Sequence, residues 1–211
     1  MVSKYTKYWR KSGLKEKGAG DFLLNHIRQK RPKNFLEIGV FHGVTSRNIC
    51  ELLFSLHREN FKFTGVDIFS KNSESLNEEY APNLKFSNPL KKIYYKYIIR
   101  TDPYSLQSVL NLLKKFKNNV NIIKGNSNKV LKDLNLEKFD YVFLDGGHKF
   151  ETVKSDLEYL TKVISNGGTV VCDDYNLFQA PGVKAAIEEY VLEKKFNLKI
   201  LYSRFAEISK N

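Results

Sequence analysis

The chain has 211 residues, of which 42% are hydrophobic, and its 35 basic and 23 acidic residues give a formal net charge of +12. This length suits one well-filled α/β domain over residues 1–211 and is short for two. No apolar run reaches membrane-spanning length and the first residues lack the apolar region of a signal peptide, so we expect a cytoplasmic protein with no membrane partner.

Residues 1–32 are expected to form an N-terminal helical segment, with a helix through Phe22, Leu23 and Ile27. The next stretch, 34–38, is apolar except for Glu37, as in a parallel strand that is covered on both faces. A carboxylate in such a strand needs a partner.

Two glycines, Gly39 and Gly43, bracket the turn after this strand, where a ligand can approach the backbone. Thr45 then opens a helix with apolar residues at helical spacing, and the free amide groups at its start attract an anion. A second apolar strand, 61–66, ends in Asp67, where an acid commonly accepts the hydroxyls of a ribose. This order of elements predicts a pocket for a nucleoside cofactor.

The connection 70–104 is longer than a strand-to-helix link requires. We expect it to form a substrate lid, with a partly disordered surface insertion as the alternative. It contains the best candidate patch for a polyanion, namely Lys91, Lys92, Lys96 and Arg100 interleaved with Tyr94, Tyr95 and Tyr97. Because basic residues are spread over most predicted helices, a compositional bias explains the charge better than nucleic-acid binding.

Further strands at 120–123, 141–144 and 169–172 alternate with amphipathic helices, which implies a parallel sheet. A helix begins at Pro181, and two short strands follow at 199–202 and 206–208. Cys50 and Cys172 are expected to be buried core residues rather than catalytic or disulfide-bonded ones.

The spacing of the glycines indicates which kind of nucleoside cofactor the turn fits. The turn has the pattern E-x-G-x-x-x-G, whereas a dinucleotide fold requires G-x-G-x-x-G. With Asp67, this pattern resembles the first motif of class I S-adenosylmethionine-dependent methyltransferases. The resemblance covers nearly the whole chain and is closest to small metal-dependent O-methyltransferases of the catechol, caffeoyl-CoA and macrocin-like sugar types. It implies a Rossmann-like α/β fold: a seven-stranded, mostly parallel sheet with helices on both faces and an antiparallel last strand.

The resemblance also implies contacts with S-adenosyl-L-methionine. Glu37 would hold the methionine amino group, Thr45 its carboxylate and Asp67 the ribose, while Gly39 and Gly43 admit the cofactor. The other residues expected at the cofactor are Ile68, Asn126, Ser127 and Asp145, with Ser127 at the position that hydrogen-bonds the adenine.

Three aspartates, Asp145, Asp173 and Asp174, follow the fourth and fifth strands, whose carboxyl ends face one crevice. Carboxylates so placed repel one another unless a cation neutralises them, and oxygen ligands suit magnesium, manganese or calcium. We therefore expect a divalent metal, Mg²⁺ or similar, on these three residues, with helix capping as the alternative for a single aspartate. Relatives usually carry asparagine at the place of Asp174, which leaves the third ligand open.

His148 lies three residues after Asp145, where relatives carry a basic catalytic residue, and its near-neutral pKa suits proton removal. The alternatives are a helix cap and a metal ligand. The predicted function is methyl transfer to a hydroxyl of a small molecule, either a sugar or a catechol-like acceptor with adjacent oxygens. RNA ribose methylation and a non-catalytic cofactor-binding subunit stay open, as does a homodimer.

Overall fold

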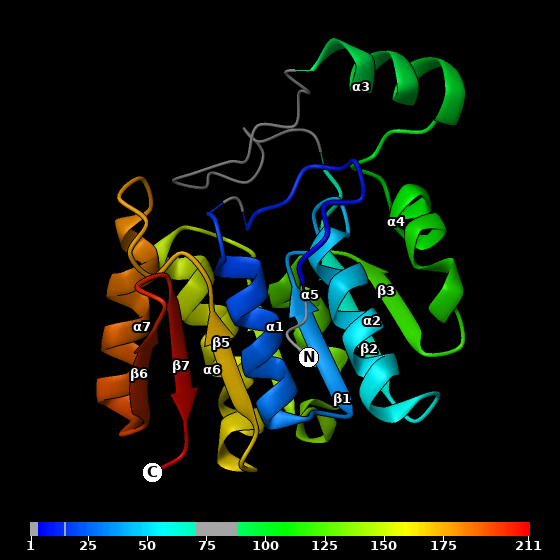
Figure 1. The fold of residues 1–211 in the computed structure, drawn as a ribbon. Helices are drawn as coiled ribbons and strands as arrows, with labels where there is room; N and C mark the ends of the chain where they lie inside the picture. The colour runs from blue at the N-terminus through cyan, green and yellow to red at the C-terminus, as the bar shows by residue number, and fades with distance from the viewer. Residues whose placement is uncertain (1–3, 15, 71–87) are drawn as a thin grey trace.

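The computed structural model describes residues 4–14, 16–70 and 88–211. Within this part of the chain, seven strands form one sheet in the order β3-β2-β1-β4-β5-β7-β6 (Figure 1). The five strands from β3 to β5 run parallel, and β7 is antiparallel to both of its neighbours. The predicted fold class is therefore confirmed. The strands are β1 Asn34–Ile38, β2 Lys62–Asp67, β3 Val120–Lys124, β4 Tyr141–Leu144, β5 Thr169–Cys172, β6 Asn197–Leu201 and β7 Phe205–Ser209.

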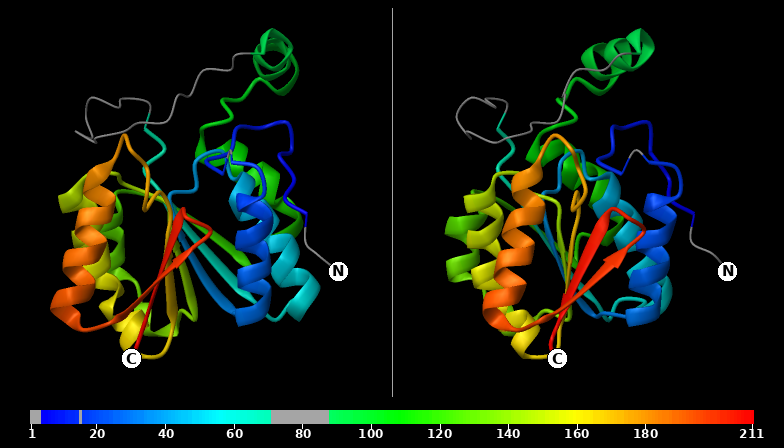
Figure 2. Two further views of the ribbon diagram at one scale, coloured as in Figure 1. Left: turned by 60° about the vertical axis from the view of Figure 1, so that its left-hand side comes forward. Right: turned by 90° about the vertical axis from the view of Figure 1, so that its left-hand side faces the viewer.

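Helices cover both faces of the sheet (Figure 2). They are α1 Ala19–Lys30, α2 Val44–His57, α4 Leu106–Leu113, α5 Ser127–Asp133, α6 Phe150–Ser165 and α7 Pro181–Lys194, with short 3₁₀ turns at Lys114–Phe116 and Leu136–Lys138. Successive strand residues point to opposite faces, so Phe35 packs in one core with α1, α2 and α4, while Leu36 packs in a second core with α5, α6 and α7. Two cores on one sheet explain the nearly unbroken apolar strands.

Most predicted elements lie where they were expected. β1, β4 and β5 have the predicted bounds, and β2 begins and ends one residue later than predicted. β6 starts earlier and ends at Leu201 because Tyr202 and Ser203, with φ of 54° and 52°, turn the chain into β7. Cys50 and Cys172 are buried free thiols, as predicted.

The N-terminal segment is helical only from Ala19 onward. Residues 4–14, which we name the N-terminal strap, are irregular and lie against the start of α2. Asn48 of α2 accepts a hydrogen bond from the Thr6 amide at 2.9 Å and donates one to the Thr6 carbonyl at 2.8 Å. The Arg10 guanidinium is buried and donates to the carbonyls of His42, Pro103 and Ser108. The strap thus joins the glycine turn to α4.

Part of the predicted lid, 71–87, lies outside the described residues. The next residues form α3, Pro89–Ile93, which continues as a π-helix over Tyr94–Ile99 and extends away from the sheet above its upper edge in Figure 1. The Trp9 ring of the strap meets the Tyr94 ring at a centroid distance of 5.8 Å. Lys92, Lys96 and Arg100 of the basic patch are exposed. The lid role stays a prediction.

The strand order reverses between β1 and β4, so a crevice opens at the carboxyl ends of the parallel strands. Gly39 follows β1 at this edge with φ of 94°, and a Cβ added to it would lie 1.8 Å from the backbone oxygen of Asp145. Only glycine permits this close approach of the two strand ends.

Candidate functional site

The first half of the site surrounds the glycine turn. Gly43, with φ of 72°, precedes the first residue of α2, and no side chain among the described residues caps this helix. Thr45 lies in the first turn, and its Oγ1 is 2.8 Å from the Tyr5 hydroxyl of the strap. The start of α2 thus presents backbone amides and hydroxyl groups, which suit a carboxylate.

Glu37 is fully buried in β1. The Ser46 hydroxyl of α2 donates to its Oε2, whereas its Oε1 has no hydrogen-bond partner among the described residues. Burial, reinforced by the nearby Asp67 carboxylate and opposed by the Ser46 hydrogen bond, raises the pKa of Glu37 to about 8. A buried carboxylate oxygen without a partner is costly, so this position fits a cationic ligand group.

Asp67 closes β2 on the other side of the turn. Its Oδ2 accepts from the Phe41 amide at 2.7 Å, and its Oδ1 accepts from the Phe69 amide at 2.7 Å and the Tyr104 hydroxyl at 3.1 Å. Burial raises the pKa of this carboxyl group, while these donors oppose the shift. Ile68 is half-buried directly after Asp67.

Asn126 and Ser127 lie at the start of α5. The Asn126 side chain accepts from the Asn128 amide at 2.9 Å and caps the helix, and the Ser127 hydroxyl donates to Asp156 of α6 at 3.0 Å. Both side chains therefore have structural partners. An adenine contact of Ser127 would have to share its hydroxyl with Asp156, and this contact stays a prediction.

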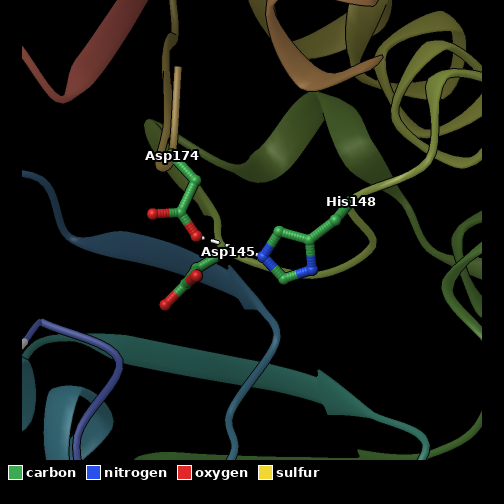
Figure 3. Close-up of side chains that lie close together, drawn as sticks. All are labelled: Asp145, His148 and Asp174. Carbon is green, nitrogen blue, oxygen red and sulfur yellow. Dashed lines mark hydrogen bonds and ion pairs between the residues drawn. The ribbon is translucent and has the colours of Figure 1, made fainter. Parts of the chain in front are cut away.

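The second half of the site lies at the ends of β4 and β5 and contains Asp145, His148 and Asp174 (Figure 3). Each offers a ligand atom, and these atoms lie within 4.8 Å of one another. His148 Nε2 is 3.0 Å from Asp174 Oδ2, and Asp174 adopts the left-handed conformation, with φ of 57°. The three side chains line a small pocket of about 10 Å³ together with apolar residues such as Val153 and Val183.

Asp173 points to a different partner from the one predicted. The Arg204 guanidinium of the β6–β7 turn binds it in a two-pronged way, with Nε 2.5 Å from Oδ1 and a terminal nitrogen 2.7 Å from Oδ2. The same terminal nitrogen lies 2.9 Å from Asp174 Oδ1. The structure therefore brings Asp145 and Asp174 together with His148, whereas Asp173 is occupied by Arg204. Metal coordination by Asp173 stays a prediction.

Burial dominates the electrostatics of this cluster. It raises the pKa of Asp145 well above its ordinary range, and the neighbouring Asp173 and Asp174 add to the shift. It also raises the pKa of Asp173 to about 6, although the hydrogen bonds from Arg204 oppose the shift. The cluster would gain from a further positive charge.

Sequence reasoning missed Arg204 and the residues of the strap. The predicted antiparallel last strand was a usable signal for Arg204, because the hairpin that it implies turns at the carboxyl edge of the sheet. No comparable signal marks Tyr5 or Arg10, whose partners are mostly backbone carbonyls and hydroxyls distant in sequence.

The sheet order, the E-x-G-x-x-x-G turn and the buried acids after it define a class I methyltransferase fold. The chain belongs to a methyltransferase family, since the family model described as "Methyltransferase domain" matches residues 36–175. The predicted resemblance to S-adenosylmethionine-dependent methyltransferases is thus confirmed. A comparison with curated proteins found no match.

Solved structures with this fold include several O-methyltransferases. A caffeoyl-CoA O-methyltransferase candidate from Staphylococcus aureus is 17% identical, with a TM-score of 0.62 over 93% of this chain and 84% of that one. The O-methyltransferase of Bacillus cereus, solved with SAH, is 12% identical, with a TM-score of 0.59 over 92% and 82%. CalS11, a TDP-rhamnose 3'-O-methyltransferase, is 17% identical, with a TM-score of 0.59 over 93% and 81%. Among the described residues, no helix has the length and apolar character needed to span a bilayer.

Proposed function

We propose that this protein is an S-adenosylmethionine-dependent O-methyltransferase that acts on a hydroxyl group of a small molecule, a sugar or another acceptor with adjacent oxygens. The observation that carries the proposal is the convergence of Asp145, His148 and Asp174 beside the cofactor pocket. Carboxylates and a histidine can orient a hydroxyl and remove its proton. The O-methyltransferases among the solved structures with this fold, including one that acts on a deoxysugar nucleotide, support the same choice.

The residues of the first half fit the cofactor. Glu37 Oε1 would accept from the methionine ammonium, which supplies the positive charge that this buried oxygen lacks. The amides at the start of α2 and the Thr45 hydroxyl would bind the methionine carboxylate, and Asp67 would accept a ribose hydroxyl. When bound, the sulfonium group supplies an activated methyl, so the protein must align and deprotonate the acceptor.

In the second half, His148 is the proposed base. Asp174 holds its Nε2, and when Nε2 carries the proton the basic lone pair is on Nδ1. Asp174 thereby orients the ring and stabilises the imidazolium that forms when His148 takes the acceptor proton.

The donor set also fits a divalent cation. Asp145 and Asp174 offer the oxygen ligands that Mg²⁺ or Mn²⁺ prefers, and His148 Nε2 is within reach of both. A bound ion would lower the pKa of the acceptor hydroxyl. The two roles of His148 are alternatives: if Nε2 binds the ion, the ring proton is on Nδ1, and His148 acts as a metal ligand instead of the base.

Transfer of radiolabelled methyl from S-adenosylmethionine tests the proposal. The purified enzyme is incubated with pooled small metabolites, polysaccharide or RNA, with and without a chelator. We expect label in hydroxyl-bearing metabolites, a loss of incorporation with chelator, and restoration by Mg²⁺. Asp145→Asn should abolish turnover while cofactor binding persists, and the exposed Asp133→Asn is the matched control. Label in RNA alone would refute the small-molecule acceptor, and no transfer to any acceptor would favour a non-catalytic subunit.

A further inference from the structure

Arg204 is the feature of the acidic cluster that the proposed chemistry does not use. It comes from the β6–β7 turn, and only 17% of its side chain is exposed. Its guanidinium covers both oxygens of Asp173, contacts Asp174 Oδ1, and lies 3.5 Å from the Gly13 carbonyl of the strap. This two-pronged geometry is the one in which arginine binds a carboxylate most specifically.

The position of Arg204 divides the aspartates into two groups. A cation that used Asp173 would have to displace two charge-assisted hydrogen bonds at 2.5 and 2.7 Å. Asp145 and Asp174 Oδ2, by contrast, lie with His148 in a group whose ligand atoms are within 4.8 Å of one another. A divalent ion in that group would also lie close to the guanidinium on Asp174 Oδ1, and the two positive charges would repel each other.

We propose that Arg204 lowers the affinity of this site for a cation. It occupies both oxygens of Asp173, and its positive charge repels a cation bound to the neighbouring carboxylates. The inference rests on the cation site in the proposed function. It makes Arg204 a positioning residue and gives the protein a weak, exchangeable ion in a shell of Asp145, His148 and Asp174. Arginine suits this role because its guanidinium stays charged throughout the physiological pH range.

Titration with Mn²⁺, followed by electron paramagnetic resonance of the free ion, tests this role without any acceptor. Arg204→Met removes the charge at similar length, and Arg204→Lys keeps the charge but loses the two-pronged contact. Lys199→Met removes the same charge from an exposed position of β6 and is the control. Even with the screening of bulk water, removing a charge a few ångströms from a divalent ion should tighten binding about tenfold.

We expect Arg204→Met to bind Mn²⁺ about tenfold more tightly than the wild type, Arg204→Lys to lie between them, and Lys199→Met to equal the wild type. Adding Asp173→Asn to Arg204→Met should return the affinity toward that of the wild type. Arg204→Met also leaves Asp173 and Asp174 without their guanidinium partner, so Mn²⁺ should raise its melting temperature more than that of the wild type.

The results separate this inference from the proposed function. If the wild type binds no Mn²⁺ and Arg204→Met does, the cation dependence of the activity and the weak ion in the wild type are wrong, while the role of Arg204 in opposing cation binding stands. Equal or weaker binding in Arg204→Met than in the wild type overturns the inference. If Arg204→Met does not fold, Arg204→Lys decides, since unchanged affinity in that variant contradicts a role for the two-pronged contact.

Discussion

The two halves of the crevice handle buried negative charge in opposite ways. Around the glycine turn, Glu37 and Asp67 are held by hydroxyl and amide donors, and one oxygen of Glu37 has no partner among the described residues. At the ends of β4 and β5, the carboxylates of Asp173 and Asp174 have a guanidinium and an imidazole of the protein as partners. The first half therefore needs a positive charge from its ligand, whereas the second half already contains one.

Because of this difference, we expect substitutions in the two halves to impair different properties of the enzyme. A ligand that carries an ammonium and a sulfonium complements the first half, so changes there should act on cofactor affinity. The second half has an oriented histidine and a carboxylate, Asp145, whose pKa is raised by burial and by neighbouring acids. Changes there should act on turnover.

The largest expected effect is that of His148→Ala. Loss of a positioned base typically lowers the rate about 10²- to 10⁴-fold, and we expect a decrease of this size in kcat with an unchanged Kd for S-adenosylhomocysteine. Steady-state kinetics and calorimetry measure the two quantities. His57→Ala, at the C-terminal end of α2, is the control: it removes a histidine outside the proposed site and should leave kcat unchanged. Unchanged turnover of His148→Ala would contradict the role of His148 as the base.

Glu37→Gln should produce the converse result. The amide is close in shape to the protonated carboxyl group but cannot bind an ammonium by charge, and loss of a charge-assisted hydrogen bond corresponds to about 10- to 100-fold in Kd. We expect this loss for S-adenosylhomocysteine, with kcat at saturating cofactor within about threefold of the wild type. Glu51→Gln removes a half-exposed carboxylate of α2 and should leave the affinity unchanged. Equal affinities of wild type and Glu37→Gln would contradict the ammonium contact.

In the first half, the sequence signals that the structure confirms are local ones. An apolar strand with one acid implied that Glu37 needs a partner, and Ser46, nine residues later, satisfies one of its oxygens. The strands were predictable for the same reason, since burial on both faces leaves an unbroken apolar run.

The second half depends on contacts between distant residues. Arg204 meets Asp173 from 31 positions away through the β6–β7 hairpin, and His148 meets Asp174 from 26 positions away. Aspartates at two strand ends predicted that a cation is needed there, but not that the chain supplies a guanidinium. Arg10 was equally hidden, because its partners include backbone carbonyls, which every residue has.

The pH dependence of cofactor binding gives the smallest expected effect and sharpens the comparison. The pKa of Glu37 is raised to about 8 by burial, so at pH 6 this residue is protonated and must lose its proton before it can bind an ammonium. Affinity should therefore increase as the pH rises from 6 to about 7.5, where an α-amino group is still mostly charged, and a gain of about tenfold is expected. Calorimetry in buffers of different ionisation enthalpy should detect proton release on binding of S-adenosylhomocysteine at pH 6.5.

Glu37→Gln should bind with less proton release and a flatter pH profile. If the wild type has the same flat profile as Glu37→Gln, then Glu37 does not give up its proton to the cofactor, and the first half does not depend on its ligand for positive charge.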